Sequence, residues 1–204
     1  MKYCTIIVIG GSIMIENKGT KEKTQIYISE YNKILENMIS EMTEVKFTDS
    51  ISHNFIKQMI PHHRAAIEMS ENVLKYTSNV KLQDIAYNII NMQTKSIKSM
   101  DMILNCCGTI INSEKELKSY EEKNIIILEN MFCRMKNAEV TSNVSCDFMR
   151  EMMPHHMGAI EMSKNTMKYP IREGLKPILN NIITSQRKGI HQMRSLMKCL
   201  KCKQ

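Results

Sequence analysis

Histidine and methionine residues stand together in one short stretch of the chain, and that stretch occurs twice. The first copy runs from Met59 to Met69 and reads MIPHHRAAIEM; the second runs from Met152 to Met162 and reads MMPHHMGAIEM. Imidazole and thioether groups are soft ligands, and together they suit copper, Cu(I) above all, better than metals that prefer carboxylate oxygens. The repeated stretch therefore predicts a site for a soft metal ion.

The spacing within each copy places the candidate ligands beside one another on a helix. Residues three and four apart are neighbours, so Met59 stands beside His62 and His63. Adjacent side chains on a helix point about 100° apart, so we expect one ring of each His pair inward and the other at the rim. The predicted metal ligands are Met59, His62, His63, Met69, Met152, His155, His156 and Met162.

The repeat extends well beyond these stretches at a constant offset of 93 residues. At that offset Phe55 matches Phe148, Gln93 matches Gln186, and Cys106 matches Cys199. A constant offset means that no net insertion separates the copies, so the chain is an internal duplication of one supersecondary unit.

Apolar residues recur at three-and-four spacing, which predicts amphipathic helices and an all-α fold. We expect two duplicated helical hairpins, each preceded by an additional helix, which bury their apolar faces against each other in one four-helix bundle. The predicted helices of the first half cover 25–42, about 52–76 and 80–104, and those of the second half cover 118–136, 144–169 and a last one ending near 202. The repeats are 25–107 and 118–204, joined by a linker over 108–117, and both form one bundle domain.

Pro61 lies inside the second predicted helix. Within a helix it removes a hydrogen bond and should kink the backbone; alternatively, a new helix begins at Pro61. We expect the kinked helix, because the apolar stripe continues on both sides of the proline.

Residues 1–16 combine one lysine with an apolar run and end where polar sequence begins. This length suits the core of a signal peptide and is short for a membrane span. We expect a signal peptide or a membrane anchor, with the rest of the chain outside the cytoplasm. The alternative is a buried N-terminal strand or helix of a cytosolic protein. The net charge of +7 is spread along the chain, and basic residues do not interleave with aromatic ones as the binding of single-stranded nucleic acid requires.

Sulfur is abundant, with 19 methionines and seven cysteines. Methionine serves either as adaptable core filler or as a soft ligand. Four cysteines near the predicted helix ends can bind metal, form disulfides or stay free: Cys106, Cys107, Cys199 and Cys202. In addition, His53 of the first copy corresponds to Cys146 of the second, and both side chains can bind a metal.

The pattern F-x-x-x-M-[IM]-P-H-H-x-x-A-I-x-M at Phe55 and Phe148, followed by I-I-x-x-Q at Ile89 and Ile182, resembles the domain-of-unknown-function 305 family. The resemblance implies a ferritin-like four-helix bundle, usually exported or membrane-anchored, with some members similar to periplasmic copper-binding proteins that use Met and His. The chain departs from the family at Ser96 and Gly189, where the family tends to have Glu.

These observations predict a metal-binding helical bundle that holds Cu(I) for sequestration or tolerance outside the cytoplasm and is not an enzyme. The alternative is a structural or partner-binding bundle without metal, in which the histidines only satisfy buried polar groups. A ferritin-like oxidase is a third interpretation, but the chain lacks the Glu-x-x-His pairs that such sites use.

Overall fold

The computed structural model describes residues 8–9, 12–13, 18–106 and 108–202. Most of the predicted signal peptide or anchor over residues 1–16 lies outside these ranges. Within it, the two-residue strands β1 (Val8–Ile9) and β2 (Ser12–Ile13) pair antiparallel. In the described ranges no helix combines the length and the apolar character that crossing a membrane requires.

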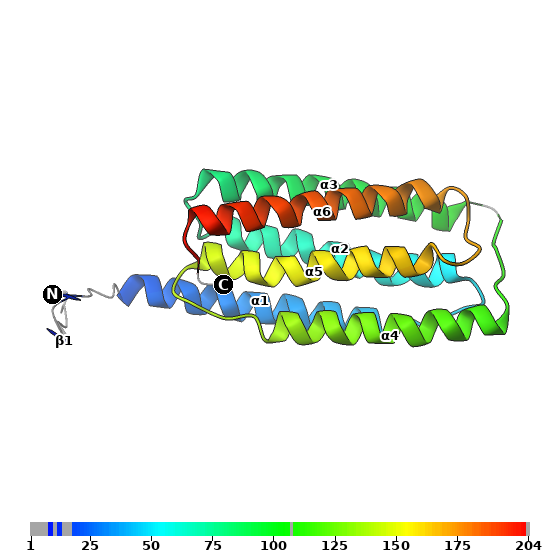
Figure 1. The fold of residues 1–204 in the computed structure, drawn as a ribbon, viewed down its shortest axis with the longest axis horizontal. Helices are drawn as coiled ribbons and strands as arrows, with labels where there is room; N and C mark the ends of the chain where they lie inside the picture. Colours follow the sequence, from blue (N-terminus) through cyan, green and yellow to red (C-terminus); the bar gives the residue numbers. More distant parts are fainter. Residues whose placement is uncertain (1–7, 10–11, 14–17, 107, 203–204) are drawn as a thin grey trace.

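Six helices make up the body of the described chain, and they lie in three layers of two (Figure 1). The middle layer holds α2 and α5, which pack on each other; α3 and α6 cover one side, and α1 and α4 cover the other. The helices are α1 (Lys18–Thr43), α2 (Ile51–Leu74), α3 (Val80–Asn105), α4 (Glu114–Lys136), α5 (Val144–Thr166) and α6 (Leu175–Cys199). This confirms the predicted bundle of two helical hairpins, each preceded by an additional helix.

The duplication reappears as paired hydrogen bonds at matching positions. Asn72 donates to the Tyr27 carbonyl at 3.0 Å, and its counterpart Asn165 donates to the Tyr120 carbonyl at 3.2 Å. Each of these tyrosines also makes an edge-to-face contact with a tyrosine just beyond the end of α2 or α5, at centroid distances of 6.0 and 5.9 Å. The two halves therefore share a pseudo-twofold axis.

Helix boundaries follow local capping chemistry. Ser113 and Glu116 form a reciprocal capping box at the start of α4, and the side chains of Asn79 and Asn143 accept backbone N–H bonds at the starts of α3 and α5. Both α2 and α5 continue through their prolines, Pro61 and Pro154. The alternative of a helix starting at Pro61 is therefore wrong. The first helix begins at Lys18, seven residues before its predicted start, and α4 begins at Glu114, four before its predicted start.

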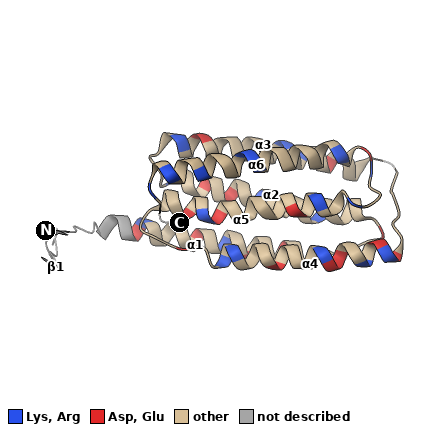
Figure 2. Ribbon diagram, in the orientation of Figure 1, with Lys and Arg blue, Asp and Glu red and all other residues tan. Residues whose placement is uncertain are grey.

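Methionine fills much of the core, which is one of the two roles that its abundance suggested. Every layer contributes thioether side chains that are at most 5% exposed, among them Met38, Met42, Met59, Met69, Met100, Met131, Met135, Met149, Met152, Met162, Met193 and Met197. Lys, Arg, Asp and Glu lie among one another along α1 to α5, whereas α6 carries exposed Lys and Arg side chains and no Asp or Glu (Figure 2). The positive net charge therefore belongs to solvated helix faces.

Candidate metal centre

His62 of α2 and His155 of α5 meet at the centre of the bundle. Their rings stack with centroids 3.6 Å apart, and both side chains are completely buried. The Nε2 atom of His62 lies 3.2 Å from the His155 carbonyl oxygen, and the Nε2 atom of His155 lies 2.9 Å from the His62 carbonyl oxygen. A carbonyl only accepts hydrogen bonds, so both Nε2 atoms carry a proton.

Burial keeps this pair neutral. Desolvation lowers the pKa of His155 to about 4 and, together with the other histidines, lowers the pKa of His62 well below its usual value. A neutral ring with its proton on Nε2 carries a lone pair on Nδ1. Both Nδ1 atoms are buried and have no hydrogen-bond partner among the described residues. Two unpartnered nitrogen lone pairs in an apolar core are ready donors for a cation.

His63 and His156 form an outer pair, turned from the axis towards α3 and α6. Their ring centroids lie 5.9 and 6.1 Å from those of His62 and His155, so each adjacent pair has one inner and one outer ring, as its spacing predicted. The outer rings are nevertheless only 1% and 2% exposed, because α3 and α6 cover them. Burial lowers the pKa of His63 to about 3 and that of His156 well below its usual value.

The four predicted methionine ligands are all buried in the same core. Met59 precedes His62 by one helical turn, and Met152 precedes His155 by one turn. Because α2 and α5 run antiparallel (Figure 1), these two thioethers flank the stacked rings on opposite sides. Met69 and Met162 stand two turns further along, with Ala66 and Ala159 between them and the inner rings.

This donor set fits a soft cation better than a hard one. Within the described ranges, no group of three or more His, Cys, Asp or Glu side chains comes together in a way that could hold a metal. Any ion in the core would therefore rely on imidazole nitrogen together with methionine sulfur. That combination matches the preference of Cu(I) and differs from zinc or di-iron sites.

The two repeated glutamates do not orient the histidines. Glu161 is exposed and Glu68 is partly exposed, on the outer side of their helices. Gln93 and Gln186 are buried and line the same cavities as the outer histidines, and their Oε1 atoms have no hydrogen-bond partner among the described residues.

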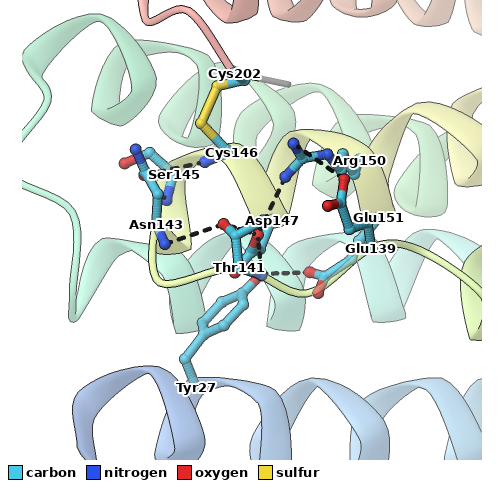
Figure 3. A network of polar contacts seen from close by, with 10 residues as sticks. All are labelled: Tyr27, Glu139, Thr141, Asn143, Ser145, Cys146, Asp147, Arg150, Glu151 and Cys202. Carbon is cyan, nitrogen blue, oxygen red and sulfur yellow. Dashed lines mark hydrogen bonds and ion pairs between the residues drawn. A yellow bond between two sulfur atoms is a disulfide. The ribbon is translucent and has the colours of Figure 1, made fainter. Parts of the chain in front are cut away.

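The cysteines at one pole form a disulfide, not a metal site. Cys146 at the start of α5 is bonded to Cys202 beyond the end of α6 (Figure 3). Cys106, Cys133 and Cys199 are free and exposed. Because its sulfur is in a disulfide, Cys146 is not a metal ligand that would match His53 of the first copy.

A buried acid near this pole was missed by sequence reasoning. Glu151 of α5 is 2% exposed and accepts a hydrogen bond from Tyr27 of α1 (Figure 3). Desolvation raises the pKa of Glu151 to about 8. Its counterpart in the first copy is the amide Gln58, which accepts from Asn124 at 2.7 Å. Aligning the two copies exposes this change from amide to acid.

The family described as "Domain of unknown function (DUF305)" has a model that matches residues 52–197. CopM in its Cu(I)-bound form shares 26% identity at a TM-score of 0.53, covering 76% of this chain and 99% of that chain. CopM in its Ag-bound form, obtained by soaking, shares 26% identity at a TM-score of 0.53, covering 76% and 97%.

A DUF305 fragment from Deinococcus radiodurans shares 19% identity at a TM-score of 0.52, covering 72% of this chain and 95% of the fragment. That likeness concerns the fold alone. No curated protein matches the chain.

Proposed function

Because the chain belongs to the DUF305 family, whose model spans both copies of the histidine motif, we propose that it binds Cu(I) in its core for sequestration or tolerance outside the cytoplasm. The observation that carries this proposal is the inner pair His62 and His155, whose buried Nδ1 lone pairs have no partner among the described residues. The CopM structures holding Cu(I) and Ag support it, at 26% identity.

In this proposal His62 and His155 supply nitrogen, while Met59 and Met152 supply sulfur on either side. His63 and His156 act as outer ligands, and Met69 and Met162 extend the run of thioethers along the helices. Cu(I) is the cargo. In this proposal the role is binding and not catalysis.

The proposed location outside the cytoplasm is supported by the disulfide between Cys146 and Cys202. Disulfides persist in oxidising compartments and are rare in the cytosol. The apolar run within residues 1–16 is consistent with export or anchoring.

The test is a Cu(I) titration against a competing chelator, after alkylation of the exposed thiols to remove their own copper affinity. Binding should be lost when His62, His63, His155 and His156 are all replaced by Ala, and retained in the His53→Ala/His191→Ala control. The Met59→Leu/Met152→Leu variant keeps the core volume and should weaken binding without unfolding the protein.

A purely structural bundle would give a different result. The quadruple variant would lose stability, while added Cu(I) would leave the melting temperature of the unaltered protein unchanged. Unchanged binding in the quadruple variant would equally reject the proposal.

A further inference from the structure

A groove between α3 and α6 leads from the surface to the outer histidines. It consists of two adjoining cavities of about 300 and 280 Å³ that share the same central wall. His156 lines the first cavity and His63 lines the second. The shared wall is made of Met92, Gln93, Asn181, Ser185 and Gln186.

The two copies differ where the groove meets the histidines. In the first copy the Ser96 hydroxyl lies 3.0 Å from the His63 Nε2 atom and closes that ring off with a hydrogen bond. In the second copy the matching position is Gly189, and a Cβ there would lie only 2.7 Å from the His156 Nε2 atom. The His156 ring therefore occupies space that any side chain at 189 would take, and the described residues give its Nε2 atom no hydrogen-bond partner.

The walls of the groove suit a cation that arrives with part of its hydration. Gln93 and Gln186 are 3% and 4% exposed, line both cavities, and leave their Oε1 acceptors without donors from the described residues. Water bound to a cation donates hydrogen bonds that such acceptors can receive. Met92 is 45% exposed and offers a thioether between surface and interior. Lys95 and Lys188 are exposed at the rim, where salt screens their charge.

We propose that this groove is the path by which a soft monovalent cation reaches the core, and that it opens on His156 while Ser96 closes the equivalent position on His63. This inference rests on the proposed function and adds the route of the ion. The ion reaches His156 of the second copy first, because Gly189 has no side chain that could close off its Nε2 atom, as Ser96 does for His63.

The experiment exchanges the two residues. The association rate is measured by adding Ag(I) to the thiol-alkylated protein in a stopped-flow instrument. In a separate titration, imidazole nitrogen NMR records which ring responds first. In the unaltered protein the His156 signals should shift at substoichiometric Ag(I), before those of His63. Gly189→Ser should slow association by about tenfold, and the double exchange Ser96→Gly/Gly189→Ser should restore the rate with His63 responding first.

Three other results would each contradict the groove assignment, the proposed function, or both. Equal association rates in all variants, with binding retained, would overturn the groove assignment and leave the proposed function standing. A double exchange as slow as Gly189→Ser alone would also overturn it, since opening His63 would then provide no path. Failure of every protein, including the unaltered one, to bind Ag(I) would reject the proposed function and this inference with it. Circular dichroism of the Gly189→Ser variant establishes that a slow rate does not come from misfolding.

Discussion

His62 and His155 hold each other in place across the pseudo-twofold axis: each ring donates its Nε2 proton to the backbone carbonyl of the other residue. Burial keeps both rings neutral, and the reciprocal bonds fix the proton of each ring on Nε2, which leaves Nδ1 unprotonated. They also place two identical donors between α2 and α5, where these two helices pack on each other. A duplicated hairpin thereby builds a symmetric centre that neither copy could make alone.

The buried histidines should make the protein sensitive to acid. Their folded-state pKa values are lowered, to about 3 for His63 and about 4 for His155. As pH falls from about 6.5 towards 4, the unfolded chain takes up protons that the folded chain refuses, so stability falls over that window. Each such ring contributes roughly 1.4 kcal/mol per pH unit. Urea unfolding at pH 7.5 and 5 measures the loss.

The matched variant for that measurement is His62→Gln/His155→Gln, which keeps side chains able to donate hydrogen bonds but unable to titrate. It should show a shallower pH dependence, whereas the exposed His191→Ala control should keep the full slope. Identical slopes in all three proteins would contradict the neutral, buried state of the inner pair.

Glu151 should act in the opposite direction. Its folded-state pKa is raised to about 8, so between about 4.5 and 8 the folded chain keeps a proton that the unfolded chain releases, and stability falls as pH rises. Glu151→Gln copies the first half, where Gln58 accepts from Asn124 and donates to the Met42 carbonyl. It should stabilise the protein at pH 8.5 by roughly 2 kcal/mol or more, since each pKa unit corresponds to about 1.4 kcal/mol.

Thermal unfolding at pH 8.5 and pH 5 checks this, and the gain should shrink at the lower pH. The reverse change, Gln58→Glu, should introduce a similar penalty at high pH. A Glu151→Gln variant with equal effects at both pH values would show that the carboxyl is not held protonated.

Gly158 should resist replacement even though it lies inside a helix. A Cβ at this position would overlap the Met131 side chain of α4. Gly158→Ala should therefore destabilise by about 1–3 kcal/mol, although an exposed helix position would gain from the same change. The control is Ala65→Gly at the matching site of the first copy. A raised melting temperature for Gly158→Ala would contradict the close packing of Gly158 against Met131.

Reduction of the disulfide should weaken the fold. The Cys146–Cys202 bond closes a loop with a sequence separation of 56 residues, and Cys202→Ser should cost about 2–4 kcal/mol. Denaturant midpoints with and without reductant measure this loss. Cys199→Ser, three residues earlier and free, should leave the midpoint unchanged. If reductant has no effect on the unaltered protein, the bond does not form in solution.

Much of the architecture followed from the constant offset between the copies. Because His62 and His155 match at that offset, a twofold arrangement brings them together, and the sequence predicted an inner and an outer ring in each pair. The full burial of His63 and His156 did not follow, because it depends on how closely α3 and α6 pack over them.

The disulfide could not be predicted from the repeat. Cys146 corresponds to His53, so comparison of the copies offered it no partner. The pairing depends on the turn after α6, where Lys201 adopts a left-handed conformation with φ 53° and Cys202 reaches the start of α5. Glu151, by contrast, was detectable, because its counterpart Gln58 differs only in carrying an amide.

The most direct test of the buried soft-metal centre is anomalous diffraction from a crystal of the thiol-alkylated protein soaked with Ag(I). A strong peak is expected between α2 and α5, within bonding distance of an Nδ1 atom of His62 or His155 and of the Met59 or Met152 sulfur. Silver found only at the surface, with both inner Nδ1 atoms still unpartnered, would contradict it.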